Sequence, residues 1–167
     1  MSTIYTNSIK SYIPNSKTME SLSRQIALAI LAHANPSEGF QIYLKGDLGT
    51  GKTTFVRSFL QEYGVQGKIK SPSYSLLESY TISNLEIHHF DFYRFSKPDE
   101  WINAGFRDLL NENSIILLEW PEKADGYLPN PDLSIHLEYF NSGRNATLIP
   151  KTMRGKKWLQ AIALRIC

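Results

Sequence analysis

One segment of eight residues constrains this chain more than any other part of it. The segment reads Gly46-Asp47-Leu48-Gly49-Thr50-Gly51-Lys52-Thr53 and fits the pattern G-x-x-x-x-G-K-S/T of a phosphate-binding loop. In such a loop, glycines let the backbone curl so that its N–H groups surround the phosphates. The lysine reaches the β- and γ-phosphates, and the last hydroxyl ligates magnesium. The segment therefore predicts a site for a nucleoside triphosphate with Mg²⁺.

The residues around the loop fit the setting in which such a loop works. Residues 40–45 form a short apolar run typical of a strand, which stops at Gly46. After the loop, Phe55, Phe59 and Tyr63 recur every four residues, as one face of a helix requires. Gly64 is expected to end that helix. The order of strand, glycine loop and helix supports the phosphate-binding interpretation over an ordinary glycine turn.

The rest of the chain alternates between strand-like and helix-like segments. We expect a helix over 18–33, capped by Asn15 or Ser16, and a helix start at 96–99. Mixed strands with helices between them predict a three-layer α/β fold of the P-loop NTPase type, with a mixed central sheet in a single domain over 1–167. The other expected elements are an early strand within 1–14, a hairpin of 74–80 and 85–90, strands at 114–119, 132–139 and 145–149 with a turn at 141–143, and a closing helix at 155–166.

Composition excludes several classes of protein and favours a cytoplasmic one. The chain has 167 residues, of which 42% are hydrophobic, and no apolar run approaches the ~20 residues of a membrane span. The start of the chain has no cationic flank, so we expect no signal peptide. Cys167 is the single cysteine, which rules out an internal disulfide. The net charge of +2 does not by itself indicate a nucleic-acid partner.

Two acidic residues end strand-like runs and could complete the site. Glu119 follows the apolar residues 115–118, and Asp91 follows residues 87–90. A triphosphatase needs an acid that holds magnesium and a group that orients the attacking water. The sequence does not decide which of the two does which, and each could also be a solvated carboxylate at a strand end. His88 and His89 alternate across a strand, so packing or support of a neighbouring residue is a better interpretation than a metal site.

Three further features allow two interpretations each. The hydroxyl-rich segment 71–75 follows the helix after the loop and is either a γ-phosphate-sensing switch or a proline turn before a strand. Trp120 could lie beside a nucleotide, although a core position is the default for a tryptophan. Basic residues of the C-terminal stretch are better explained as a solvated helix face than as a contact with tRNA or a partner; they are Lys151, Arg154, Lys156, Lys157 and Arg165.

Taken together, these segments resemble the TsaE (YjeE) family of bacterial ATPases. The resemblance extends from about Ile13 to Ile149, and the order and separation of the segments also fit. One departure is Ser73, where the family usually has threonine, so that a hydroxyl remains but a methyl group is lost. The matching segments are 46–54, 71–76, 89–94 (His-Phe-Asp-Phe-Tyr-Arg) and 119–121 (Glu-Trp-Pro).

The resemblance implies a function and a set of site residues. The family supports synthesis of threonylcarbamoyladenosine next to the anticodon of tRNAs that read codons starting with A. It acts with TsaB and TsaD, and the TsaE-type protein binds and hydrolyses ATP. By resemblance, Lys52 binds phosphate, Thr53 and Glu119 hold Mg²⁺, and Asp91 and Trp120 are needed for activity. The nucleotide-binding set is then Gly46, Asp47, Gly49, Thr50, Gly51, Lys52, Thr53, Thr54 and Trp120, with Ser16, Thr18 and Arg144 as further contacts.

Other functions fit the sequence less well. A P-loop kinase for a small metabolite is the alternative, because residues 91–94 could hold a substrate hydroxyl. The segment after Glu119 turns into strands, however, and lacks the arginine-rich helical lid of such kinases. A GTP-driven switch lacks an Asn-Lys-x-Asp segment, and a binding module with a degenerate loop would not be expected to keep Lys52, Thr53 and both acids. No arginine is obviously placed as a finger, so we expect slow hydrolysis alone and faster hydrolysis with the partners.

Overall fold

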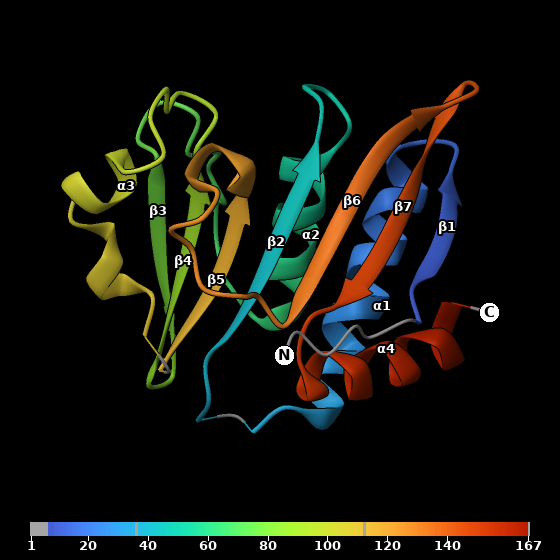
Figure 1. Ribbon diagram of the computed structural model, residues 1–167. Coiled ribbons are helices and arrows are strands. Elements are labelled where there is room, and N and C mark those ends of the chain that lie inside the picture. Colours follow the sequence, from blue (N-terminus) through green and yellow to red (C-terminus); the bar gives the residue numbers. More distant parts are fainter. Residues whose placement is uncertain (1–6, 36, 112, 167) are drawn as a thin grey trace.

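The computed structural model describes residues 7–35, 37–111 and 113–166, which build one seven-stranded sheet. The strand order is β1-β7-β6-β2-β5-β4-β3, so the first and last strands of the chain lie side by side (Figure 1). Cys167 and residues 1–6 lie outside the described residues. The strands are β1 Ile9–Ile13, β2 Phe40–Gly46, β3 Leu77–Ile82, β4 Leu85–Asp91, β5 Ser114–Glu119, β6 Leu133–Phe140 and β7 Gly143–Pro150.

The sheet is mixed, as expected for the predicted fold class. The four strands β6, β2, β5 and β4 run parallel, whereas β1, β7 and β3 pair antiparallel with their neighbours. β5 is buried along its whole length, and its apolar residues point to both faces. Parallel strands end at the same edge of a sheet, so the carboxyl ends of β2, β4 and β5 are brought together.

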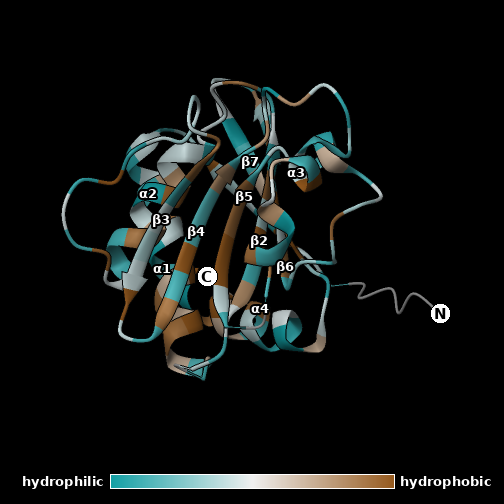
Figure 2. Ribbon diagram, turned by 90° about the vertical axis from the view of Figure 1, so that its left-hand side faces the viewer, coloured by the Kyte–Doolittle hydropathy of each residue, from teal (hydrophilic) through white to brown (hydrophobic). Residues whose placement is uncertain are grey.

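Helices cover both faces of the sheet and form the predicted three layers. Figure 2 shows α1 and α2 on one side and α3 on the other, with α4 at one end. The larger core lies between the sheet and α1, α2 and α4, and a second core of mostly aromatic residues lies on the α3 side. The helices are α1 Ser16–His33, α2 Lys52–Tyr63, α3 Glu100–Asn103 and α4 Met153–Ile166, with short 3-10 turns η1 Phe106–Leu109 and η2 Pro121–Ala124.

α1 ends where the sequence predicts but begins two residues earlier, at Ser16, and α2 ends as predicted. The Asn15 side chain accepts a hydrogen bond from the backbone N–H of Thr18 at 3.0 Å and so caps α1. Gly64 ends α2 with φ of 118°, a conformation that favours glycine. Within the described residues, no helix has both the length and the apolar character needed to cross a membrane.

The structure corrects the expected start of β3. The strand begins at Leu77 rather than Tyr74, because residues 72–76 form a turn in which the Leu76 N–H bonds the Pro72 carbonyl at 2.8 Å. Leu76 adopts φ of 66°, which no strand residue would have. The alternation of residues 74–76 imitates a strand, but Tyr74 is 84% exposed.

Smaller corrections concern the second half of the chain. Gly143 is the first residue of β7, so the turn after β6 has only Asn141 and Ser142 between the strands. The helix expected from 96–99 is the single turn α3, whose start is fixed by Glu100 accepting from the backbone of Ser96 and Lys97. The closing helix α4 begins at Met153, two residues earlier than predicted.

Candidate nucleotide-binding site

A cavity of about 520 Å³ lies where the carboxyl ends of β2, β4 and β5 meet. The phosphate loop follows β2, while β4 and β5 end in Asp91 and Glu119, which are partners across the two strands. Glu119 also pairs with Leu44 of β2, so the loop and both acids converge on one point. Open α/β sheets bind ligands at this edge.

Glycines give the loop a backbone that other residues rarely adopt. Gly49 and Gly51 have φ of 79° and 104°, and Gly51 directly precedes the first residue of α2. Arg144 of β7 holds the loop from the side, because its Nη1 donates to the Thr50 carbonyl at 2.8 Å. The N-terminus of α2 therefore borders the cavity, where its partial positive charge would stabilise an anion.

Lys52 is enclosed by the loop and is only 4% exposed. Its ammonium group donates to the carbonyl of Gly46 and, at 2.9 Å, to that of Asp47. It also lies 4.1 Å from the centre of the Trp120 ring. Burial lowers the pKa of Lys52, and the negative charge of Glu119 acts in the opposite direction. The arrangement places a cation at the loop, where a phosphate group could bind it.

Glu119 is the most enclosed acid of the site. Both of its carboxylate oxygens lie 3.0 Å from the Thr53 hydroxyl, at the start of α2. Its Oε1 also accepts from Nε2 of His89 at 2.7 Å. A hydroxyl and a carboxylate are hard oxygen ligands of the kind that Mg²⁺ prefers, so Thr53 and Glu119 fit a magnesium ion by their chemistry.

Asp91 borders the same cavity from β4. Its Oδ1 accepts from the backbone N–H of Tyr93 at 3.0 Å, which fixes the carboxylate at the strand end. Burial raises the pKa of Asp91, although the Tyr93 hydrogen bond opposes this. A carboxylate that holds a proton more readily than usual is suited to accept a hydrogen bond from water.

Trp120 lies in the cavity wall rather than wholly in the core. It adopts φ of 61° and ψ of 49°, a left-handed conformation that is rare for a bulky residue and costs on the order of 1–3 kcal/mol. Its ring lies 5.0 Å from that of Tyr93, and its backbone N–H donates to the Leu44 carbonyl. This conformation turns the chain sharply after Glu119 and brings the indole over Lys52.

The structure brings most of the predicted site residues together. Four of the predicted residues do not line the cavity: Gly46, Asp47, Thr50 and Thr18. The first two hold Lys52 through their carbonyls, Thr50 is buried within the loop, and Thr18 helps to cap α1 through Asn15. The predicted residues that do line it are Ser16, Gly49, Gly51, Lys52, Thr53, Thr54, Asp91, Glu119, Trp120 and Arg144.

Other lining residues were not predicted as site residues. Arg94 is one of them: its Nε donates to the Ser73 carbonyl at 2.7 Å, and its guanidinium lies 4.4 Å from the centre of the Tyr74 ring. Arg94 therefore fixes the hydroxyl-rich segment 71–75 beside the cavity, which Ser71 and Ser73 line. The sequence places Arg94 in a matching segment, but its contact with residues far away in the chain has no local signal. Leu48 and Tyr93 also line the cavity and were not predicted as site residues.

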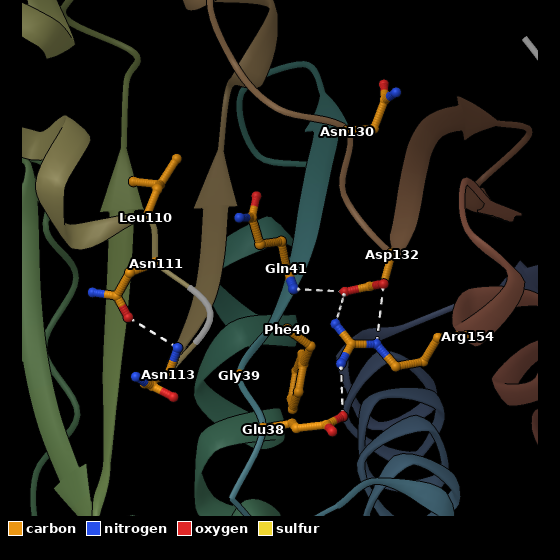
Figure 3. A pocket seen from close by; sticks show the side chains of 10 residues that line it. All are labelled: Glu38, Gly39, Phe40, Gln41, Leu110, Asn111, Asn113, Asn130, Asp132 and Arg154. Carbon is orange, nitrogen blue, oxygen red and sulfur yellow. Dashed lines mark hydrogen bonds and ion pairs between the residues drawn. The ribbon is translucent and has the colours of Figure 1, made fainter.

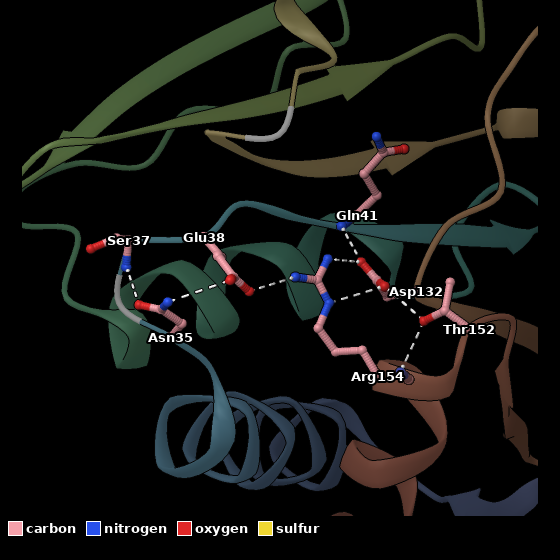
Figure 4. Close-up of polar contacts among 8 residues, drawn as sticks. Asn35, Ser37, Glu38, Gln41, Asp132, Thr152 and Arg154 are labelled. Carbon is pink, nitrogen blue, oxygen red and sulfur yellow. Dashed lines mark hydrogen bonds and ion pairs between the residues drawn. The ribbon is translucent and has the colours of Figure 1, made fainter.

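A second cavity, of about 500 Å³, lies at the opposite edge of the sheet, where β2 and β5 begin (Figure 3). Its main charged groups are already paired. Asp132 accepts from Arg154 Nη2 at 2.7 Å, from the Thr152 hydroxyl at 2.7 Å and from the Gln41 backbone N–H at 3.1 Å. Arg154 also lies 3.6 Å from Glu38 (Figure 4). The network joins β2, β6 and α4 and has no catalytic geometry.

Comparison with known proteins identifies the family of the chain. The family model described as "Threonylcarbamoyl adenosine biosynthesis protein TsaE" matches residues 13–146, which includes the loop and both acids. The chain belongs to the TsaE family. A Haemophilus influenzae protein named "tRNA threonylcarbamoyladenosine biosynthesis protein TsaE" is 41% identical over 156 residues, which cover 93% of this chain and 98% of that protein.

A second sequence relative supports the family, and a solved structure supports the fold. A Rickettsia bellii relative with the same name is 32% identical and covers 78% of this chain and 91% of its own length. The crystal structure of Bacillus subtilis YdiB superposes with a TM-score of 0.72 over 95% of this chain and 96% of that one, at 22% identity. The structural likeness supports the α/β fold, and the sequence relatives connect the chain to the TsaE family.

Proposed function

We propose that this TsaE-family chain binds and hydrolyses ATP with Mg²⁺ as part of the machinery that makes threonylcarbamoyladenosine in tRNA. The observation that carries the proposal is the convergence of Lys52, Thr53 and Glu119 at one cavity. Lys52 is enclosed by the loop carbonyls, and Thr53 lies 3.0 Å from the carboxylate of Glu119. Lys52 supplies a positive charge that can bind phosphate. Thr53 and Glu119 supply oxygen atoms that can bind a metal ion.

The chain's own groups would bind and orient the triphosphate. The loop backbone and the N-terminus of α2 would donate N–H groups to the phosphates. Lys52 would exchange its carbonyl partners for phosphate oxygens, a stronger charge-assisted contact. Thr53 and Glu119 would hold Mg²⁺. The metal ion would neutralise the negative charge that develops on the phosphate oxygens.

Hydrolysis then requires a water molecule in line with the bond that breaks. The water oxygen forms a bond to the γ-phosphorus while the bond to the ADP oxygen breaks, and the products are ADP and inorganic phosphate. Asp91 and Glu119 both lie where they could orient that water. The raised pKa of Asp91 favours it as the group that receives the water proton, directly or by way of phosphate.

We expect slow turnover by this chain alone. Arg94 and Arg144 both line the cavity, but Arg94 is bound to the Ser73 carbonyl and Arg144 to the Thr50 carbonyl. Each hydrogen bond uses one guanidinium nitrogen to hold a neighbouring segment, so we expect both arginines to shape the cavity rather than to act as an arginine finger. The proposal therefore assigns TsaB and TsaD as protein partners that raise the rate, and tRNA as an indirect partner through their complex.

The test is ATP hydrolysis by the purified protein with Mg²⁺, alone and with TsaB and TsaD, with Lys52→Ala as the inactive control. We expect slow release of phosphate that rises when both partners are added, and loss of both rates in the variant. Equal rates with and without the partners would contradict the assembly role. Hydrolysis that survives Lys52→Ala would remove the loop from the mechanism, and phosphate transfer to a small hydroxyl compound would indicate a kinase.

A further inference from the structure

We propose that His89 is a positioning residue that fixes the carboxylate of Glu119 for its role at the metal. This inference rests on the proposed function, because it concerns the same site. His89 lies on β4 and Glu119 on the adjacent strand β5. Nothing in the matches to the TsaE family assigns a role to this histidine.

The contact between the side chains of His89 and Glu119 is short and shielded from solvent. His89 Nε2 lies 2.7 Å from Glu119 Oε1, and the two side chains are 1% and 2% exposed. A carboxylate can only accept, so the hydrogen must be on Nε2. In a buried setting such a hydrogen bond is stronger than at a surface, because water does not compete for it.

Packing alone does not account for a histidine at this position. On the same face of β4, Leu85 and Ile87 belong to the core under α1 and α2. The Nδ1 atom of His89 is buried with no hydrogen-bond partner among the described residues, which is unfavourable for a polar group. An apolar residue would avoid this cost, so the contact with Glu119 is the interaction that explains the imidazole.

His89 holds Glu119 independently of the phosphate loop. The other partner of the carboxylate is Thr53, the residue proposed to ligate Mg²⁺, and its hydroxyl has only one hydrogen to donate. His89 comes from the sheet, so it would keep Oε1 in place while Oε2 and Thr53 adjust to the metal. Groups that orient metal-binding carboxylates in this way commonly contribute about 10–100-fold to metal affinity or activity.

The neighbouring histidine provides a matched control. His88 is also buried but points to the other face of β4, where its Nδ1 lies 2.8 Å from the Ser79 hydroxyl. Its Nε2 lies 3.4 Å from Glu86, which is not part of the site. A substitution at His88 disturbs the same strand and removes the same kind of side chain without touching Glu119.

The experiment compares His89→Met, His89→Gln and His88→Gln in the full-length protein. Calorimetric titration of ATP, first with Mg²⁺ and then with EDTA, separates metal-dependent from metal-independent binding, and steady-state hydrolysis gives kcat and KM. We expect His89→Met to weaken the magnesium-dependent part of binding, raise KM to the same degree and lower kcat about 10–100-fold, with unchanged binding in EDTA. His89→Gln can supply an N–H near the Nε2 position and should restore most of the loss.

Several outcomes would overturn the inference. One is a folded His89→Met protein with wild-type magnesium dependence and kcat. Another is a His89→Gln protein as impaired as His89→Met, or a His88→Gln protein impaired to the same degree, since either would point to general strand packing. If the wild-type protein bound no ATP with Mg²⁺, the proposed function itself would fail. If instead the wild-type protein bound ATP with Mg²⁺ and the His89 variants bound and hydrolysed it equally well, only the inference about His89 would fail.

Discussion

Glu119 and Asp132 are both buried carboxylates beside β2, yet they lie at opposite edges of the sheet and have different surroundings. Asp132 accepts from a guanidinium, a hydroxyl and a backbone N–H, all from parts of the structure that hold the fold together. Glu119 accepts from one hydroxyl and one imidazole, and it forms a wall of the cavity beside Lys52. Burial alone therefore does not distinguish a structural acid from one proposed to bind a metal.

The nature of the partners makes the difference. Arg154 forms a bidentate pair with Asp132, which leaves little accepting capacity for a ligand. Thr53 donates a single hydrogen that both oxygens of Glu119 share, and no Lys or Arg among the described residues pairs with Glu119 within salt-bridge distance. A carboxylate whose oxygens accept few hydrogen bonds can still bind a cation. A carboxylate in a bidentate pair with an arginine instead stabilises the fold around it.

The largest effect is expected for Glu119→Gln. The amide keeps the size of the side chain but removes the charge proposed to hold Mg²⁺, so ATP turnover should fall about 100–1,000-fold. The free energy of unfolding should change little, because no Lys or Arg among the described residues forms an ion pair with this carboxylate. Phosphate release and urea denaturation measure the two quantities. A strong loss of stability with normal turnover would make Glu119 the structural acid instead.

The opposite pattern is expected for Asp132→Asn. The amide group would face N–H donors of Arg154 and leave part of a buried network unsatisfied, at a cost of about 2–3 kcal/mol in the free energy of unfolding. Turnover per folded molecule should stay at the wild-type level. Glu38→Gln is the matched control, since Glu38 contacts the same arginine at 3.6 Å from an exposed position. If a folded Asp132→Asn protein no longer bound ATP, the claim that Asp132 has only a structural role would be wrong.

A smaller loss of stability is expected for Gly155→Ala. A Cβ at this position of α4 would lie 1.9 Å from the Asp132 carbonyl oxygen, so the helix or the start of β6 must move. Alanine favours a helix, which offsets part of this strain, and a net loss of about 1–2 kcal/mol remains. Thermal and urea unfolding would measure it. A variant as stable as the wild-type protein would mean that this edge adapts easily.

The predicted boundaries succeed where the signal is local. Asn15, Gly64 and the glycines of the loop each determine the backbone beside them, so the cap of α1 and the end of α2 are correct, although α1 begins at Ser16 rather than at residue 18. The start of β3 could not be predicted, because residues 74–76 alternate like a strand. Arg94, about twenty residues later, holds them in another conformation.

For the site residues, too, the sequence predicts only what a local pattern marks. The sequence identifies Lys52, Thr53, Asp91 and Glu119 as candidates because a motif or a strand end marks each of them. His89 could be placed only as a packing or supporting residue, since its contact with Glu119 depends on the order of β4 and β5 in the sheet. No local sequence pattern marks Asp132, because its hydrogen-bond partners are residues 41, 152 and 154, which lie elsewhere in the chain.

The last expected effect is a change of stability with pH. Burial lowers the pKa of both His88 and His136 below the ordinary 6.5. The unfolded chain then binds more protons than the folded one below that value, so the free energy of unfolding should fall as the pH drops from about 7 to about 5.5. The slope is at most about 1.4 kcal/mol per pH unit for each histidine. His88→Gln should give a shallower slope in urea denaturation, and an unchanged slope would exclude His88 as a source.

The most direct test of the contrast between the two edges is a crystal structure with Mg²⁺ and a non-hydrolysable ATP analogue. We predict the triphosphate at the N-terminus of α2, with Lys52 on its phosphates and Mg²⁺ bound at Thr53 and Glu119. The pair of Asp132 and Arg154 should remain intact. A nucleotide bound at the Asp132 edge, or a metal away from Glu119, would contradict the account.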